Sequence, residues 1–448
     1  MKTVWMFPGP SGHVAGALGQ LVDPESDQLS ILKTIDTVAD EYRWGPVSPL
    51  LLGPADETTE QHDGHLWLGF FATSLVLSEL LIDAGVAGDV LIGHSGGEVS
   101  ALVVAGCMTV EDAARVLCER TLAVEGNGLP ESGMLAVAAP ARRLAMMCDV
   151  VDDSSLAVSV DNSPDQVVVT GLVSGLERLE TVAAALEIKT HRLRFAAAYH
   201  NPVLGGAARR LAARVGDVPV RSPQRRVYSP QLGRTLATAD DARELLAGTL
   251  VLPVRFRETL RTLYDDGARV FVECGARQVL SELVPHNLPA AASAVPLLIG
   301  RAQAHAVPRL LKSLAAEHPA SWQTASLLVV PAALDNPQLS LDDLKPNAPD
   351  PVAVPGPAEA SDDLPAEPEL RDQIRHAYAD VLRFPVEMVE DDTELEGELG
   401  ISSLQRTNVF VRLLDTYGLP TPAEEVQVFT YRTVADMAGL LRDLAARR

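Results

Sequence analysis

One short stretch of the chain places a hydroxyl nucleophile in a backbone that could present it. Residues 89–92 form an apolar run with β-branched side chains, and Gly93-His94-Ser95-Gly96-Gly97 follows directly. Glycines two residues before and two residues after Ser95 permit the cramped strand-to-helix turn that holds a serine hydroxyl clear of the backbone. The helix expected from about Glu98 would offer unpaired N–H groups, which suit a developing oxyanion. The pattern favours a nucleophilic serine; the alternative is a tight turn whose serine only caps a helix.

The elements expected around this turn alternate between strand and helix. Hydrophobic periodicity predicts strands at residues 4–7 and 89–92, and helices at 66–84, 98–106 and 110–126. This order is typical of a layered α/β domain. The chain then changes texture, with strands predicted at 134–137, 156–160, 166–170 and 189–193 and helices at 139–147 and 173–186. That βαββαβ order predicts a small subdomain at about 131–195, inserted in the larger one. A strand predicted at 269–275 belongs again to the larger subdomain.

The last third of the chain predicts a tether followed by a helical domain. A helical extension is expected at 301–329, and residues 330–368 are rich in proline with scattered acidic residues, which is typical of a semi-extended linker. Helical patterns at 370–382, 403–417, 423–428 and 434–445 show little sign of strand. They predict a helical bundle at 369–448.

Composition limits the classes of function. A chain of 448 residues, 47% of them hydrophobic, can bury a large core and is expected to hold two or more domains. Lys and Arg number 37 against 60 Asp and Glu, a net charge of −23, which argues against nucleic acid or an anionic membrane as the main partner. The four cysteines show neither metal spacing nor a disulfide framework, so we expect no metal site and a reducing, cytoplasmic setting.

Neither of the apolar segments that could indicate a membrane does so. The N-terminal residues reach Pro8 too soon for the apolar core of a signal peptide. The most apolar run, 66–84, is interrupted by Ser74, Ser78, Glu79 and Asp83. We therefore expect it to be a buried helix rather than a membrane span.

Several motifs spread over the first 300 or so residues carry a family resemblance. They are Phe7-Pro8-Gly9, the Gly93–Glu98 turn, Ala105-Gly106, Arg120, Asn162-Ser163-Pro164, Tyr199-His200-Asn201-Pro202, Pro253-Val254-Arg255-Phe256 and Glu273-Cys274-Gly275. In these the chain resembles the malonyl-CoA:acyl carrier protein transacylase family, which includes the acyltransferase domains of polyketide synthases. The resemblance implies an α/β-hydrolase-like large subdomain with a parallel sheet over residues 1–300 and a small ferredoxin-like subdomain. Beyond residue 369 the chain resembles an acyl carrier protein, with Leu399-Gly400-Ile401-Ser402-Ser403-Leu404 at the attachment motif.

The resemblance assigns roles to individual residues. Ser95 would accept the acyl group, and His200 would be the base that removes its proton and later protonates the departing thiolate. Arg120 stands where the family has an arginine that pairs with the free carboxylate of malonyl-type groups, through two parallel hydrogen bonds that lysine cannot imitate. Without the resemblance, the residue type and context favour a packing or capping role for His200 and a surface position near Glu119 for Arg120.

Further residues are expected to line the acyl site. Asn162 could orient His200, close the pocket, or serve only the turn that contains it. His94 and Tyr199 flank the two expected catalytic residues, and His94 is not expected to be the base.

The chain departs from the family at three places in this site. The family has glutamine after Phe-Pro-Gly, whose backbone N–H helps to bind the oxyanion, but Pro10 has no N–H. Ser11 N–H or a water could replace it, and Gly96 N–H would remain the other donor. Gly96 itself stands where many relatives carry a side chain, and Ala197-Ala198-Tyr199-His200 fits neither the malonyl nor the methylmalonyl signature. The acyl pocket is therefore expected to be reshaped.

In the carrier, Ser403 is the expected attachment site of a 4′-phosphopantetheine arm. Ser402 replaces the aspartate that usually precedes this serine and is the second candidate, and Ser403 could also serve as a helix N-cap. The acidic run at 387–398 suits carriers that dock on basic faces of partner enzymes, although such runs are usually solvated faces.

Taken together, the sequence predicts an acyltransferase fused to its own carrier. An acyl unit, expected to be malonyl-type, would pass from acyl-CoA through Ser95 to the arm on Ser403, and no nucleic acid or membrane would take part. The expected partners are a phosphopantetheinyl transferase and separate ketosynthase or tailoring enzymes of polyketide or related biosynthesis. Three alternatives stay open: an editing hydrolase, a carrier scaffold with an impaired first domain, and an α/β-hydrolase whose late histidine is His286, His305 or His318.

Overall fold

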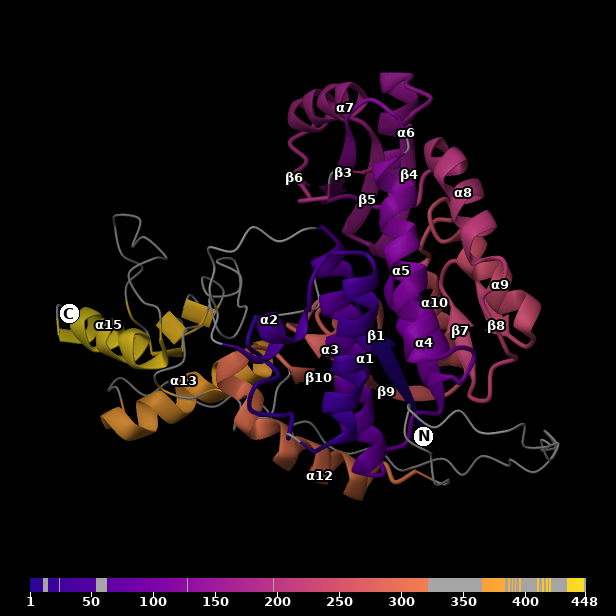
Figure 1. Ribbon diagram of the computed structural model, residues 1–448. Helices are drawn as coiled ribbons and strands as arrows, with labels where there is room; N and C mark the ends of the chain where they lie inside the picture. Colours follow the sequence, from indigo (N-terminus) through magenta and orange to yellow (C-terminus); the bar gives the residue numbers. More distant parts are fainter. Residues whose placement is uncertain are drawn as a thin grey trace. The chain divides into compact units, whose positions relative to one another are not determined.

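The computed structural model describes two separate units of the chain. Residues 1–320 are described apart from 11–14, 24, 54–62, 127 and 196, and further on the described residues are 365–382, 386, 389, 391, 395, 409–410, 413–414, 416–417, 419 and 433–446. The described residues of one compact unit fall within Met1–Leu328, and those of the other fall within Val329–Arg448. Figure 1 shows the elements of both.

A six-stranded sheet forms the centre of the first unit, in the order β10-β9-β1-β2-β7-β8. Its strands are β1 (Lys2–Phe7), β2 (Val90–Gly93), β7 (Val227–Ser229), β8 (Arg234–Leu236), β9 (Ala268–Ala276) and β10 (Ser293–Leu298). The pairs β1–β2, β1–β9, β9–β10 and β2–β7 are parallel, which confirms the expected parallel sheet. The edge strand β8 differs, because it forms an antiparallel hairpin with β7.

Helices cover this sheet on both faces (Figure 1). They are α1 (Asp27–Glu41), α2 (Ser48–Leu52), α3 (Asp63–Asp83), α4 (Gly97–Val104), α5 (Val110–Glu125), α8 (Gly205–Val215), α9 (Ala239–Gly248), α10 (Phe256–Asp265), α11 (Leu283–Asn287) and α12 (Val307–Glu317), with short 3₁₀ turns at Pro202–Leu204 and Arg301–Ala306. Local signals fix several starts: the Thr109 side chain accepts a hydrogen bond from Asp112 N at the start of α5, and Thr238 and Asp241 form a capping box at α9.

Helix α3 is the helix in the described residues that is long and apolar enough to cross a membrane. It packs against α1, α5 and β9, and 83% of the apolar window lies buried inside the fold. The sequence expectation of a buried core helix is confirmed.

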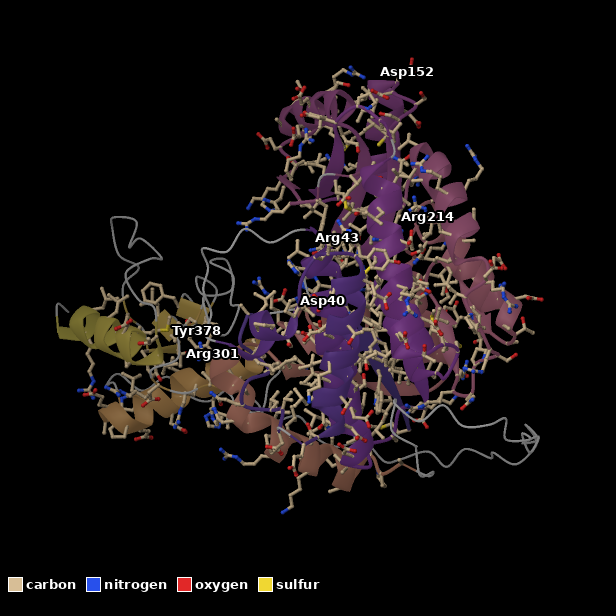
Figure 2. The ribbon with its side chains drawn as sticks, in the orientation of Figure 1. Asp40, Arg43, Asp152, Arg214, Arg301 and Tyr378 are labelled. Carbon is tan, nitrogen blue, oxygen red and sulfur yellow. The ribbon has the colours of Figure 1, made fainter. Side chains whose placement is uncertain are left out.

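The inserted subdomain has the predicted βαββαβ order. Its elements are β3 (Ser132–Val137), α6 (Ala141–Val151), β4 (Ala157–Ser163), β5 (Gln166–Leu172), α7 (Val173–Ala185) and β6 (Thr190–Arg192). The strands form an antiparallel sheet in the order β4-β5-β3-β6, which is the ferredoxin-like order. Helices α6 and α7 lie side by side over this sheet, and Asp152, in left-handed conformation, ends α6 at the outer tip of the subdomain (Figure 2).

The second unit contains α13 (Glu367–Leu382) and α15 (Val434–Ala446), which pack against each other. Leu370, Ile374 and Tyr378 on α13 are fully buried, as are Val434, Met437 and Leu441 on α15. The Tyr378 hydroxyl lies 3.6 Å from the Met437 sulfur within this core (Figure 2 labels Tyr378). Two apolar faces buried in this way are typical of a helical bundle. The predicted helix at 423–428, most of that at 403–417 and the linker at 330–364 lie outside the described residues.

Candidate active site

The strand-to-helix turn around Ser95 has the geometry that its glycines predict. Ser95 has φ = 58°, a left-handed conformation that non-glycine residues rarely adopt, between the end of β2 and the start of α4. A Cβ on Gly93 would lie 2.1 Å from Glu98 N, and one on Gly97 would lie 2.0 Å from Phe7 O. The turn can close this tightly only because both positions are glycine.

His200 lies directly against the serine. Its Nε2 is 2.6 Å from Ser95 Oγ, and its Nδ1 is 2.9 Å from the Leu252 carbonyl oxygen. A carbonyl oxygen can only accept, so Nδ1 carries the proton and Nε2 accepts from the serine hydroxyl. This is the tautomer in which the imidazole can take the serine proton.

The surroundings of His200 keep its imidazole neutral. The residue is 1% exposed, and burial, followed by the positive charge of Arg120, lowers its pKa to about 3. A neutral imidazole in contact with a serine hydroxyl can act as a general base.

The backbone around His200 is held by buried hydrogen bonds from two directions. His200 itself has φ = 61°, and its N–H donates to Leu250 O at 2.8 Å. The side chain of Asn201 donates to the carbonyl oxygens of Ser155 and Thr170 in the small subdomain, at 2.8 and 3.0 Å. The histidine is thus fixed at the junction of the two subdomains, a role of Asn201 that its sequence motif did not reveal.

Arg120 lies on α5 with its side chain fully buried. Among the described residues, no group meets hydrogen-bond geometry with its three guanidinium nitrogens, and the neighbouring Tyr199 side chain raises the pKa of the guanidinium. Its central carbon lies 3.9 Å from the ring centroid of Trp67 and 4.5 Å from that of Tyr199. Burial lowers the pKa of Arg120 to about 10, so the group remains charged at neutral pH. A buried cation without an anionic partner is costly, and a carboxylate would satisfy it.

Trp67 is a site residue that the sequence did not indicate. It is 3% exposed, it comes from α3, and its ring contacts that of Tyr199 edge to face at 5.3 Å. In sequence it is one apolar residue within an apolar helix, so periodicity marks it only as core. Trp67 occupies the space that a side chain at position 96 would need, because a Cβ on Gly96 would lie 2.6 Å from Cζ3 of the Trp67 ring. The indole therefore fills the space beside Gly96.

His94 and Asn162 interact with each other. His94 Nε2 lies 2.8 Å from Asn162 Oδ1, and Asn162 Nδ2 donates to Gln166 at 3.0 Å. The suggestion that Asn162 orients His200 is wrong in this structure, since Leu252 accepts from the histidine instead. Burial lowers the pKa of His94, so it too is held neutral.

A buried carboxyl group links the turn around Ser95 to another part of the chain. Glu98, at the start of α4, is 2% exposed and accepts from Ser229 Oγ at 2.5 Å and Gln231 N at 3.0 Å. The Gln231 side chain donates in turn to the Ser95 carbonyl oxygen at 3.5 Å. Burial raises the pKa of Glu98 to about 8. The carboxyl group thus connects the β7–β8 hairpin to the turn, a link between segments that are distant in sequence.

The remaining expected site residues are only partly described. Pro10 belongs to the loop after β1, and this loop touches the turn, since a Cβ on Gly9 would lie 3.3 Å from His94 O and 3.8 Å from Ser95 Cβ. Ser11 and Ser403 lie outside the described residues. Of the alternative late histidines, His286 faces Asp165 at 3.3 Å and His318 lies 4.0 Å from Glu317, whereas His200 contacts Ser95.

Comparison with protein families agrees with this arrangement. Residues 5–318 match the acyl transferase domain family, and residues 372–441 match the phosphopantetheine attachment site family. The second match includes Ser403 and overlaps both described carrier helices. The domain it identifies carries a covalently attached 4′-phosphopantetheine.

Individual relatives support the first match. The chain is 29% identical over 283 residues to mycoketide-CoA synthase of Mycobacterium tuberculosis, covering 62% of this chain but only 7% of that protein. It is 28% identical over 289 residues to malonyl CoA-acyl carrier protein transacylase of Bacillus subtilis, covering 63% and 89% of the two chains. The acyltransferase domain from module 8 of the salinomycin polyketide synthase is 26% identical, with a TM-score of 0.61 over 71% of this chain and 76% of that one. The chain thus belongs to the acyl transferase domain family and is an acyltransferase joined to a phosphopantetheine carrier domain.

Proposed function

We propose that the protein transfers a malonyl-type acyl group from CoA to its own carrier domain. The observation that carries this proposal is the contact of 2.6 Å between Ser95 Oγ and His200 Nε2 at a strained strand-to-helix turn. The buried Arg120, with no hydrogen-bond acceptor among the described residues, supports a carboxylated acyl unit.

Acylation of Ser95 is the first half of the reaction. His200 Nε2 takes the hydroxyl proton as Ser95 Oγ attacks the thioester carbonyl, whose electron pair moves onto the oxygen. The N–H of Gly96, at the start of α4, donates to that oxyanion. When the intermediate collapses, the C–S bond breaks and His200 returns the proton to the leaving thiolate of CoA.

In the second half the acyl group leaves Ser95. A 4′-phosphopantetheine arm on Ser403 supplies the accepting thiol. His200 acts again as base and then protonates Ser95 Oγ as the ester breaks. The segment 330–368 would hold the carrier at high local concentration, which favours transfer within one chain.

The biological setting follows from the relatives and belongs to the proposal. They include polyketide synthases and a malonyl transacylase, so we infer a role in polyketide or related biosynthesis. The cytoplasmic setting expected from the cysteines belongs to the same proposal. A phosphopantetheinyl transferase would load the carrier, and separate ketosynthase or tailoring enzymes would use it.

The loop after β1 provides a test of the oxyanion site. Pro10 cannot donate a backbone hydrogen bond, and loss of one such donor costs on the order of a hundred- to a thousandfold in rate. We expect Pro10→Gln to raise the rate of Ser95 acylation by about tenfold or more, measured by mass spectrometry of samples quenched at intervals. Adding Ser95→Ala to this variant should abolish the adduct. An unchanged rate in a variant that keeps its melting temperature would show that another donor already completes the site.

The depressed pKa of His200 predicts an unusual pH profile. An imidazole base loses activity as the pH falls through its pKa, and kcat/KM reports the pKa of the free enzyme. With an ordinary pKa of about 6.5, kcat/KM would fall about tenfold between pH 7.5 and pH 5.5. Because burial and Arg120 lower the pKa to about 3, we expect a change of less than about twofold. A tenfold fall in kcat/KM, with the fold intact at pH 5.5, would contradict the buried environment described for His200.

The proposal as a whole is tested by loading the phosphopantetheinylated protein with a panel of acyl-CoAs. Malonyl-CoA should give an acyl adduct by intact mass spectrometry, and acetyl-CoA should give much less. Ser95→Ala and Ser403→Ala serve as controls. Steady release of free acid without an adduct would favour an editing hydrolase, and phosphopantetheine on Ser403 without any acyl adduct would favour a carrier scaffold.

A further inference from the structure

The indole of Trp67 occupies the position that connects the nucleophile to the buried arginine. It packs beside Gly96, the residue next to Ser95, where an added Cβ would lie 2.6 Å from Cζ3 of the ring. The same ring lies 3.9 Å from the central carbon of the Arg120 guanidinium. One side chain thus lies beside the residue that follows Ser95 and also beside Arg120.

Trp67 and Tyr199 form a corner around the guanidinium. Their centroids lie 3.9 and 4.5 Å from the Arg120 carbon but only 5.3 Å from each other. Two rings on opposite faces of the group would be more than 8 Å apart by these distances, so they cover adjacent sides. The guanidinium nitrogens, which lack hydrogen-bond acceptors among the described residues, are left to meet a carboxylate away from this corner.

A malonyl unit has only one carbon between its two carbonyl carbons. If one end is esterified to Ser95 Oγ and the other pairs with Arg120, that middle carbon must lie between them, along the wall made by Trp67. A substituent on it would meet the indole or the Tyr199 ring. Both are nearly fully buried, at 3% and 7% exposure, and Trp67 is packed further against Phe70. Such a wall cannot yield without repacking.

We propose that Trp67 is a specificity-determining residue that restricts the acyl site to unsubstituted malonyl and excludes 2-alkylmalonyl units. This inference rests on the proposed function. Exclusion of one or two methylene groups by a packed wall is worth about 10- to 200-fold in kcat/KM. The restriction comes from α3, a core helix outside the sequence motifs of the site.

The test is a competition between equimolar malonyl-, methylmalonyl- and ethylmalonyl-CoA, read as acyl mass on Ser95 in the Ser403→Ala background. The parent should carry malonyl almost alone. Trp67→Leu should shift the ratio of branched to malonyl adducts by about tenfold or more while malonyl is still accepted. Phe71→Leu, which replaces a buried aromatic ring one turn along the same helix, should leave the ratio unchanged.

Two further readouts keep the outcomes distinct. Trp67→Phe retains an aromatic ring and should give an intermediate ratio, so it replaces Trp67→Leu if that variant does not fold. Gly96→Ala should lower the melting temperature in the parent but less beside Trp67→Leu, because the 2.6 Å approach to the indole is removed and only the 3.0 Å approach to Phe70 Cζ remains. A parent that malonylates Ser95 and a folded Trp67 variant with an unchanged ratio would overturn this inference alone. A parent with no adduct from any of the three would overturn the proposed function.

Discussion

Replacing His200 with alanine is expected to lower the rate of Ser95 acylation by about a thousandfold or more. The imidazole lies within hydrogen-bond distance of the serine hydroxyl, and general bases of this kind contribute about 10²- to 10⁴-fold. The neutral tautomer is fixed by the Leu252 carbonyl, so the base is ready without reorganisation. Single-turnover mass spectrometry with malonyl-CoA measures the rate directly.

A matched control is available next to the nucleophile. His94 is also neutral and is partly buried, but it is hydrogen-bonded to Asn162 rather than to Ser95. His94→Gln should therefore cost much less than His200→Ala when both proteins are shown to be folded. Full activity of His200→Ala would point to another histidine, such as His286, His305 or His318, and would contradict the proposed dyad.

Replacing Arg120 has the second largest expected effect, and it acts on selectivity. Arg120→Leu should lower kcat/KM for malonyl-CoA by about a hundredfold or more, since two charge-assisted hydrogen bonds to the carboxylate are lost. The value for acetyl-CoA should change far less, because acetyl has no carboxylate to bind. Arg120→Lys should recover only part of the malonyl activity, since a lysine cannot form the bidentate pair.

Stability gives this variant an independent readout. The guanidinium of Arg120 is fully buried without a hydrogen-bond acceptor among the described residues, and its pKa is lowered by burial. Removing such a charge relieves a desolvation cost, although cation–π contacts with Trp67 and Tyr199 offset part of it. We therefore expect Arg120→Leu to keep or raise the melting temperature. Equal losses with malonyl- and acetyl-CoA would show that Arg120 supports only the fold.

The parts of the fold that local pattern determines could be predicted from the sequence. The turn at Ser95 follows from two glycines whose side chains would collide with backbone atoms, and the βαββαβ insert follows from alternating periodicity. The antiparallel edge strand β8 could not be predicted, because three residues, Arg234–Leu236, carry too little periodicity to reveal a strand or its direction.

The parts of the site that depend on distant contacts stayed hidden. The acceptor that fixes the His200 tautomer is a backbone carbonyl, which leaves no trace in the residue type of Leu252. The apolar helix around Trp67 predicts only that this residue belongs to the core. It is a site residue because Gly96 and Arg120, which are distant in sequence, pack against it. Of the roles left open for Asn162, orientation of His200 is not the one observed, since Asn162 hydrogen-bonds to His94 and sequence spacing does not show which imidazole it reaches.

The order in which two peptides gain mass tests the transfer most directly. The phosphopantetheinylated protein would be mixed with malonyl-CoA, quenched at intervals and digested, and the peptides that contain Ser95 and Ser403 followed by mass spectrometry. Acyl mass should appear first on the Ser95 peptide and then on the Ser403 peptide, and Ser95→Ala should abolish both. Acyl mass on the Ser403 peptide at an undiminished rate in Ser95→Ala would contradict a route through the serine of the large domain.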